Sequence, residues 1–251
     1  MAVDVLAVGA HPDDVDMIVG GTVAKLTARG RSVVILDLTR GEMSSRGTPE
    51  IRAEEAMRAG QVLGVEDRII LDLGDGRLED SMENRRVLVE TIRELRPRIV
   101  MGHYWEDLHP DHVAAGNLLR SVMYPVGFAN YPAEGEPFRP AEFLFFMAHL
   151  PFEPSFIVDV TGFMERKLEA VRCFASQLYS EGRPGPATGI SSPDFLDRLE
   201  ARARYFGSRI ERVHGEPFFV VRPVPMADPV EHYAPFPRLH AGRDYGEGGG
   251  E

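Results

Sequence analysis

Two short polar clusters carry most of the side chains that could do chemistry. The first places His11, Asp13, Asp14 and Asp16 within six residues. Three carboxylates and an imidazole this close repel one another unless a positive charge lies between them, and a divalent cation would supply it. Imidazole and carboxylate are zinc ligands, and a catalytic zinc site needs three protein ligands and one open position. The alternative is a solvated acidic turn that caps the following helix, because Asp is favoured at helix N-termini.

A second cluster repeats part of this pattern. The tripeptide His-Pro-Asp occurs at residues 11–13 and again at residues 109–111. An apolar run precedes each cluster, at residues 3–8 and 98–102, of the kind that forms a buried strand in a parallel sheet. The carboxyl ends of parallel strands lie at one edge of the sheet, where open α/β proteins bind ligands. We therefore expect the two clusters to meet at that edge.

Convergence of the two clusters would complete a metal site. His112 would add the third ligand to His11 and Asp14, and a fourth position would stay open. Asp13 would then be free to act on a water molecule. Asp111 would orient a neighbouring imidazole, as carboxylates behind metal ligands do. The alternative is a pair of solvated turns whose histidines face the core.

The elements that must position these clusters alternate along the chain. Short apolar runs predict strands at residues 3–8, 32–38, 68–73, 98–102, 142–149, 156–160 and 217–221. Apolar residues at helical spacing predict helices over residues 19–30, 48–64, 82–95, 113–122, 163–179 and 195–210. Alternation of strands and helices requires a mostly parallel sheet with helices on both faces. The expected fold class is therefore α/β, with the active site at the carboxyl ends of the strands.

Composition sets further bounds. The 251 residues fit one α/β domain, residues 1–222, followed by a Pro- and Gly-rich tail, residues 223–251, that is too polar to bury much surface. A formal net charge of -11 argues against nucleic acid as a partner, and no apolar run is long enough to span a membrane. The N-terminus lacks a secretory signal pattern and the single cysteine, Cys173, suits a reducing compartment. We therefore expect a cytoplasmic protein.

The two motifs together resemble those of a known family. His-Pro-Asp-Asp at residues 11–14 and His-Pro-Asp-His at residues 109–112 resemble the paired motifs of the LmbE-like, or PIG-L-like, zinc deacetylases. The resemblance implies a Rossmann-like fold and the removal of N-acetyl groups from small amino-sugar substrates. It also implies Zn²⁺ as the cofactor, although a set of two histidines and one aspartate suits Fe²⁺ in the cell as well.

The resemblance also implies roles for single residues. The zinc ligands of the family pattern are His11, Asp14 and His112. Asp13 would be the general base. His109 would stabilise the tetrahedral intermediate or protonate the leaving amine, with Asp111 paired to it. Whether Asp13 or His109 protonates the amine stays open.

A narrower likeness concerns the substrate. Residues 38–48, Arg52 and the pair Ser176-Gln177 resemble the bacillithiol branch of the family, whose members deacetylate N-acetylglucosaminyl-malate. This likeness implies that Arg52, Ser176 and Gln177 contact the substrate. Tyr205 resembles a tyrosine that some members use at the oxyanion. Similar members form trimers or hexamers, so we expect a homo-oligomer.

Several alternatives stay open. Leu108 stands where many bacillithiol-type members carry Arg, so an inositol glycoside or a chito-oligosaccharide is an alternative substrate. A non-catalytic α/β module that binds a sugar or a nucleotide is an alternative of a different class, although no G-x-G-x-x-G follows the first strand. A metal hydrolase of phosphate esters would call for further carboxylates to hold a second metal.

Overall fold

A seven-stranded sheet forms the centre of the computed structural model, which describes residues 2–181 and 185–234. The strands are β1 (Val5–Gly9), β2 (Val33–Asp37), β3 (Asp67–Ile70), β4 (Ile99–His103), β5 (Glu142–Phe146), β6 (Phe156–Asp159) and β7 (Gly215–Phe219). Their order in the sheet is β3-β2-β1-β4-β5-β7-β6. Strands β1 to β5 pair in parallel, whereas β7 runs antiparallel to both β5 and β6. The prediction of a mostly parallel sheet is confirmed.

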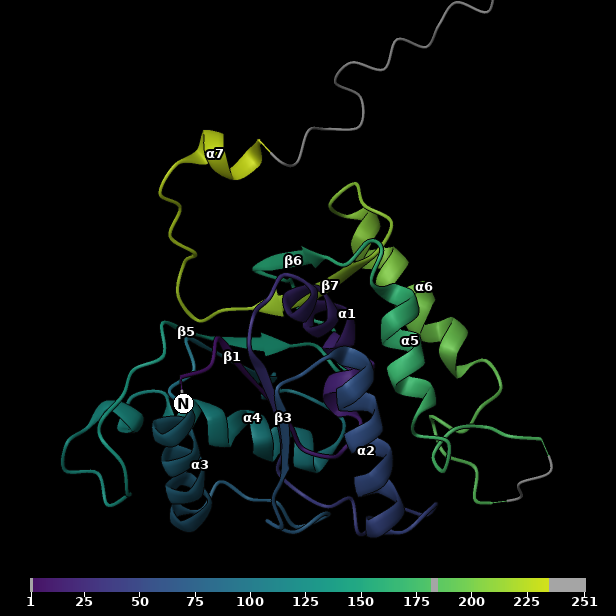
Figure 1. Ribbon diagram of the computed structural model, residues 1–251, viewed down its shortest axis with the longest axis horizontal. Coiled ribbons are helices and arrows are strands. Elements are labelled where there is room, and N and C mark those ends of the chain that lie inside the picture. The colour runs from purple at the N-terminus through teal and green to yellow at the C-terminus, as the bar shows by residue number, and fades with distance from the viewer. Residues whose placement is uncertain (1, 182–184, 235–251) are drawn as a thin grey trace, which may run out of the picture.

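Helices cover both faces of this sheet, as predicted (Figure 1). They are α1 (Asp14–Ala28), α2 (Pro49–Leu63), α3 (Met82–Leu95), α4 (Pro110–Val122), the 3-10 turn η1 (Pro125–Gly127), α5 (Met164–Arg172), α6 (Phe195–Ser208) and α7 (Pro229–Tyr233). Successive residues of β1 face opposite sides, because strand side chains alternate. Leu6 and Val8 pack with α3 and α4, whereas Val5 and Ala7 pack with α1, α2 and α5. Burial on both faces explains the unbroken apolar run of β1.

Local signals set the bounds of the middle helices. The Thr48 hydroxyl accepts a hydrogen bond from the Ile51 N–H at the start of α2, and Pro49 occupies the first turn. Helix α2 stops before Gly64, whose φ of 75° favours glycine. Helix α3 has the bounds that its apolar periodicity predicted. These helices could be predicted because their end signals lie within their own sequence.

Helix α1 begins at Asp14, several residues before the predicted start. The periodicity failed because the helix breaks at Val19, whose φ of -126° and ψ of 19° are not helical. Asp14 therefore belongs to a first helical turn that the sequence pattern does not reveal. This turn matters for function because it carries one of the predicted metal ligands.

The C-terminal third differs from the prediction at two points. Helix α5 ends at Arg172 rather than Tyr179, because the carboxylate of Glu55 accepts the backbone N–H and the hydroxyl of Ser176 and fixes a turn there. Residues 229–233 of the predicted tail form α7, which has no buried residue and lies apart from the sheet in Figure 1. Residues 235–251 of the tail lie outside the described residues.

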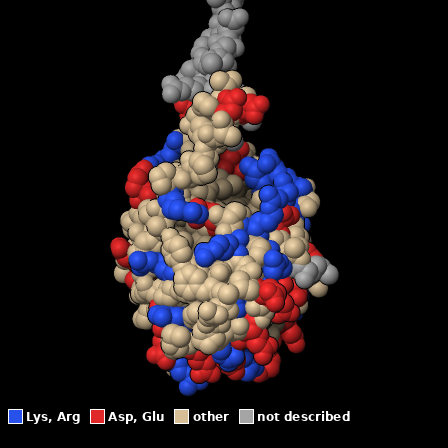
Figure 2. Space-filling view, turned by 90° about the vertical axis from the view of Figure 1, so that its left-hand side faces the viewer, with Lys and Arg blue, Asp and Glu red and all other residues tan. Residues whose placement is uncertain are grey.

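Charged side chains of both signs cover the face shown in Figure 2. Acidic side chains gather toward the end opposite the C-terminal segment, where basic side chains also lie, and a larger group of basic side chains lies nearer to that segment. Within the described ranges, none of the helices is both long enough and apolar enough to cross a membrane.

Candidate metal centre and active site

Two loops at the carboxyl ends of β1 and β4 build the site. The two strands are neighbours and run in parallel, so their loops open at the same edge of the sheet. The first loop leads from Gly9 into α1, and the second leads from His103 into α4. The ring centroids of His11 and His112 lie 5.6 Å apart. The predicted meeting of the two clusters is therefore what the structure shows.

The three predicted metal ligands converge in the interior. The Nε2 atom of His112 lies 3.2 Å from Oδ1 of Asp14, and the Nδ1 atom of His11 lies 3.4 Å from Oδ2 of Asp14. All three residues are buried. Nearby, His109 offers a further nitrogen, and ligand atoms of His11, His109 and His112 lie within 4.8 Å of one another. Two nitrogens and one oxygen at this spacing match the donors of a zinc or iron site.

The nitrogens that face away from this point are held by carboxylates. His11 Nε2 lies 3.1 Å from Asp75 Oδ1 and 3.2 Å from Asp111 Oδ2, and His112 Nδ1 lies 3.2 Å from Asp107 Oδ1. When the imidazole is neutral, its outward N–H can be donated to a carboxylate, and the inward nitrogen then keeps its lone pair for a cation. Metal-binding histidines are arranged in this way. The residues present thus fit a divalent cation.

Charge in the cluster also favours a cation. Burial opposes the charged form of both imidazoles, but their carboxylate partners outweigh it. The result is a pKa of His112 raised to about 9 and a pKa of His11 raised well above its usual range. The cluster therefore holds a positive charge in its interior more readily than water does, and a metal ion would meet the same field.

Asp13, the predicted general base, lies beside the ligands. Its Oδ2 accepts a hydrogen bond of 2.7 Å from an Arg52 NH group, which also donates to the carbonyl of Pro12. Burial raises the pKa of Asp13 to about 6, although Arg52 acts in the opposite direction. The φ of Asp13 is 150° with ψ of -21°, a conformation that residues with a Cβ rarely adopt. Such strain persists where the surroundings impose it, and it is concentrated at functional sites.

His109 and Asp111 lie at the site but are not paired as predicted. The Nδ1 of His109, the N-cap of α4, accepts the backbone N–H of Asp111 at 3.2 Å, so its Nε2 carries the proton and can donate. The carboxylate of Asp111 instead accepts from His11 and from the Gly76 backbone N–H. The pairing implied by the family resemblance was wrong, because a backbone group occupies the nitrogen that Asp111 was expected to hold. The imidazole that its carboxylate contacts is that of His11.

The structure places three of the predicted substrate contacts at or near the cavity. Arg52 and Gln177 line a cavity of about 520 Å³ that also contains the metal ligands. The amide of Gln177 bonds to Ser44 and to the carbonyl of Arg46, and so fastens the loop after β2. Ser176 bonds to Glu55 of α2. Their contact with a substrate stays a prediction.

Tyr205 lies elsewhere. It is 60% exposed on α6 and is not among the cavity residues. The cavity side of α6 is formed by Phe195, Leu199 and Arg202, which follow helical spacing that does not include position 205. The structure therefore does not bring Tyr205 to the site.

Sequence reasoning missed several residues around the site. Asp107 accepts hydrogen bonds from both His112 and His149, and the His149 ring stacks on that of His112 at 5.3 Å. Arg202 lines the cavity and donates to the backbone carbonyls of Met147 and Ala148. Asp107 follows a strand in a polar stretch and could have been suspected. Arg202 gives no local signal, because it reaches the cavity from a helix near the C-terminus.

The fold and the paired loops define the class of LmbE-like deacetylases. The family model described as PIG-L, GlcNAc-PI de-N-acetylase, matches residues 6–123, which include both loops. The diacetylchitobiose deacetylase of Thermococcus kodakarensis is 36% identical over 69% of this chain and 69% of the relative. The chain therefore belongs to the PIG-L family.

Two further comparisons agree with this assignment. A probable N-acetyl-alpha-D-glucosaminyl L-malate deacetylase 2 of Bacillus anthracis is 32% identical over 69% of this chain and 80% of the relative. A conserved protein of Thermus thermophilus has a crystal structure that matches with a TM-score of 0.82 and 38% identity, over 89% of this chain and 97% of that one. The chain is similar to both across most of its described fold.

Proposed function

We propose that the protein is a metal-dependent amide hydrolase that removes the N-acetyl group of a small N-acetylglucosaminide. The first candidate substrate is N-acetylglucosaminyl-malate, as in bacillithiol biosynthesis, and the first candidate metal is Zn²⁺, with Fe²⁺ as its alternative in the cell. One observation carries the proposal. The carboxylate of Asp13 is buried and is not one of the three proposed metal ligands. It lines the same cavity as the ligands His11, Asp14 and His112.

The residues of the site have different roles in the proposed reaction. His11, Asp14 and His112 would hold the cation, which would supply polarisation of the acetyl carbonyl and a lower pKa of the attacking water. Asp13, oriented by Arg52, accepts a proton from that water as its oxygen bonds to the carbonyl carbon. The C–N bond then breaks, and the nitrogen takes up a proton from Asp13 or His109 to leave as a free amine, with acetate as the other product. Proton transfers of this kind contribute roughly 10²–10⁴-fold to the rate.

Arg202 supports a substrate with an acidic aglycone. It lines the cavity, and within the described ranges no carboxylate lies within ion-pair distance of its guanidinium. Burial lowers the pKa of Arg202, and the carboxylates of Glu216 and Asp107 act in the opposite direction without outweighing it. A substrate carboxylate would supply the missing partner, since Arg binds carboxylates in a bidentate manner. Leu108, which replaces the Arg of other members, is 71% exposed and outside the cavity.

A panel of substrates tests the proposal. The purified protein is analysed for bound metal, and amine release is measured with N-acetylglucosaminyl-malate, diacetylchitobiose and N-acetylglucosaminyl-inositol. We expect release from the malate glycoside to be fastest and to be lost in the Asp13→Asn variant. Faster release from chitobiose or the inositol glycoside would move the protein to one of those branches. A metal-loaded protein that releases amine from none of them would support the non-catalytic binding module.

Two expectations about the intact protein stay predictions. A homo-oligomer, trimeric or hexameric, is expected from the resemblance, and light scattering of the purified protein would test it. A cytoplasmic location is expected from the sequence, and fractionation of the source cells would test it.

A further inference from the structure

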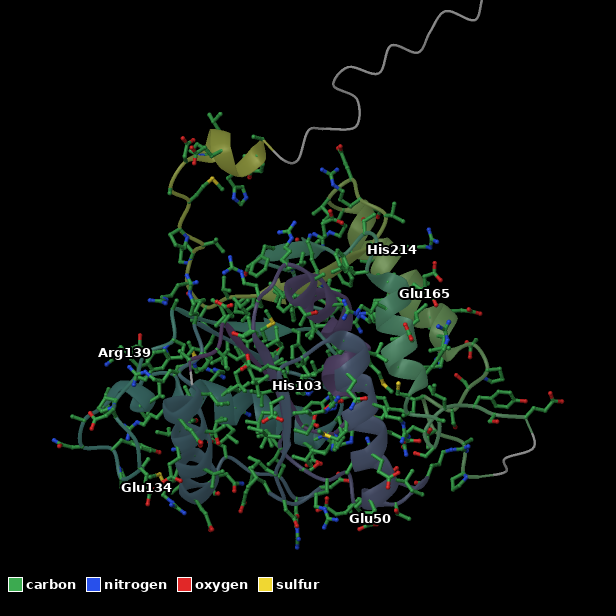
Figure 3. The ribbon with its side chains drawn as sticks, viewed as in Figure 1. Glu50, His103, Glu134, Arg139, Glu165 and His214 are labelled. Atoms are coloured by element: carbon green, nitrogen blue, oxygen red, sulfur yellow. The ribbon has the colours of Figure 1, made fainter. Side chains whose placement is uncertain are left out.

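His103 is a buried histidine beside the metal ligands to which the proposed reaction assigns no role. It ends β4 and is completely buried, and Figure 3 shows it in the interior of the molecule. Its ring stacks on that of His112 at 4.0 Å and meets the ring of Phe146 edge-on at 4.8 Å. A polar ring in this position needs a physical reason, because burying it without full hydrogen bonding is costly.

The hydrogen bonds of His103 select one tautomer. Its Nε2 lies 3.0 Å from Asp14 Oδ2, and the backbone N–H of Ala10 points at the same Nε2 from 3.3 Å. Its Nδ1 is buried without a hydrogen-bond partner. A proton on Nδ1 would let Nε2 accept from the Ala10 N–H, but that proton would be unpaired and the Nε2 lone pair would also face a carboxylate oxygen. A proton on Nε2 leaves the Ala10 N–H unpaired instead and is donated to the Asp14 carboxylate. Each tautomer leaves one N–H unpaired, so the charge-assisted bond to Asp14, the stronger of the two, decides. His103 is therefore a donor to Asp14.

This donor leaves Asp14 with only one oxygen for a cation. Its Oδ2 accepts from His103 and also from the backbone N–H of His11 at 2.8 Å. Its Oδ1 accepts neither of these bonds and faces His112 Nε2 at 3.2 Å, whereas Oδ2 already has two donors although it is the oxygen that lies 3.4 Å from His11 Nδ1. We propose that His103 is a positioning residue that fixes Asp14 as a ligand through Oδ1 alone and thereby sets the cation affinity of the site. This inference rests on the proposed metal-dependent function.

A rival role for His103 is direct ligation. A set of three possible ligand atoms, one from each residue, lies within 4.8 Å and could bind a cation; the residues are His103, Asp14 and His112. The donor role and the ligand role need opposite states of Nε2, because a ligating nitrogen cannot carry the proton donated to Asp14. Substitutions that keep or lose a donor at this point therefore separate them.

Three substitutions at this position differ in what they place near Asp14. His103→Gln puts an amide N–H close to the position of Nε2. The shorter side chain in His103→Asn ends near the position of Nδ1, where the structure has no partner, and His103→Leu has no donor at all. His214→Leu is the matched control, because His214 is also a buried histidine with ring nitrogens that lack hydrogen bonds. It lies in a different part of the fold, as Figure 3 shows.

The experiment measures the Zn²⁺ affinity of the metal-free proteins by competition with a chromogenic chelator. Unfolding midpoints of the metal-free proteins, measured separately, establish that each variant is folded. We expect His103→Leu and His103→Asn to bind Zn²⁺ about 10–100-fold more weakly than wild type, the usual effect of losing a hydrogen bond behind a metal ligand. His103→Gln and His214→Leu should stay close to wild type.

The outcomes separate this inference from the proposed function. Wild-type affinity in a folded His103→Leu protein would overturn the positioning role while leaving the metal site intact. Loss of affinity in His103→Gln as large as in His103→Leu would overturn it in favour of direct ligation. A wild-type protein that binds no metal would overturn the proposed function itself, and the positioning role with it.

Discussion

The buried ion pair of Lys167 and Glu216 hydrogen-bonds to the backbone on both sides of the break in α1. Its removal should destabilise the fold strongly. The break at Val19 frees backbone groups that a continuous helix would pair. Glu216 of β7 accepts the N–H groups of Gly21 at 3.0 Å and Thr22 at 2.7 Å. Lys167 of α5 donates to the carbonyl of Ile18 at 3.0 Å and to Glu216 at 2.7 Å. The pair therefore holds together three elements and both ends of the break.

The size of the effect follows from burial. The side chains of Lys167 and Glu216 are 4% and 2% exposed. Removing one member of a buried pair leaves the other charge without compensation, which costs about 3–5 kcal/mol. For a chain of this size 1 kcal/mol corresponds to roughly 2–4 °C in Tm, so Lys167→Met or Glu216→Gln should lower Tm by about 6–20 °C. The double variant should lose less than the sum, because neither charge is then left alone.

A double-mutant cycle measured by chemical denaturation tests this reasoning. The matched control is the pair Arg172 and Glu165, which joins two residues of α5 at 2.9 Å but is 48% and 80% exposed. Glu165 is labelled in Figure 3. Exposed pairs contribute at most about 1 kcal/mol, so the control variants should scarcely change stability. Single buried-pair variants as mild as the controls, or strictly additive effects in the double variant, would refute the argument.

Three further predictions concern the site. Asp13→Asn should lower turnover by about 10²–10⁴-fold and keep the metal, whereas His11→Ala should lose both turnover and metal. Amine release and metal analysis measure these two properties, and rapid turnover by Asp13→Asn would exclude Asp13 as the base. Asp13→Gly should be about 1 kcal/mol more stable than Asp13→Ala, because glycine tolerates a φ of 150°; equal denaturation midpoints would contradict the strain. Arg202→Gln should raise KM for N-acetylglucosaminyl-malate by roughly 10–100-fold, because a hydrogen bond to a charged group is lost, and should leave KM for diacetylchitobiose unchanged. Equal changes in the two KM values would speak against a contact between Arg202 and a substrate carboxylate.

The parts of the fold that could be predicted are those with local signals. Strand β1 is apolar along its whole length because both of its faces are buried, and α2 has its cap residues within its own sequence. The start of α1 could not be predicted, because Lys167 and Glu216 stabilise its break from far along the chain. Likewise, α5 ends where Glu55 captures Ser176. In both places a long-range contact decides between two local structures of similar propensity.

The same distinction holds within the candidate site. The ligand set of His11, Asp14 and His112 could be proposed because each motif places its residues directly after a strand. Of the carboxylates behind them, Asp111 could be proposed because it belongs to the second motif. The roles of Asp75 and Asp107 could not, because Asp75 belongs to the turn after β3 and Asp107 to a loop without a motif. Short motifs therefore indicate the ligands, and only the assembled loops show what orients them.

The first turn of α1 is fastened independently of the rest of its helix. The Asp16 carboxylate accepts two hydrogen bonds from Arg68, at 3.1 and 3.0 Å, and Arg68 also donates to Asp37 of β2. The buried ion pair at Glu216 fixes the helix beyond Val19 instead. Asp14 lies in the segment between Asp13 and the break, so its orientation depends on Arg68 and on its own hydrogen-bond donors rather than on the helix axis. The break thus lets a ligand be placed accurately at the sheet edge while the longer part of α1 packs on α5.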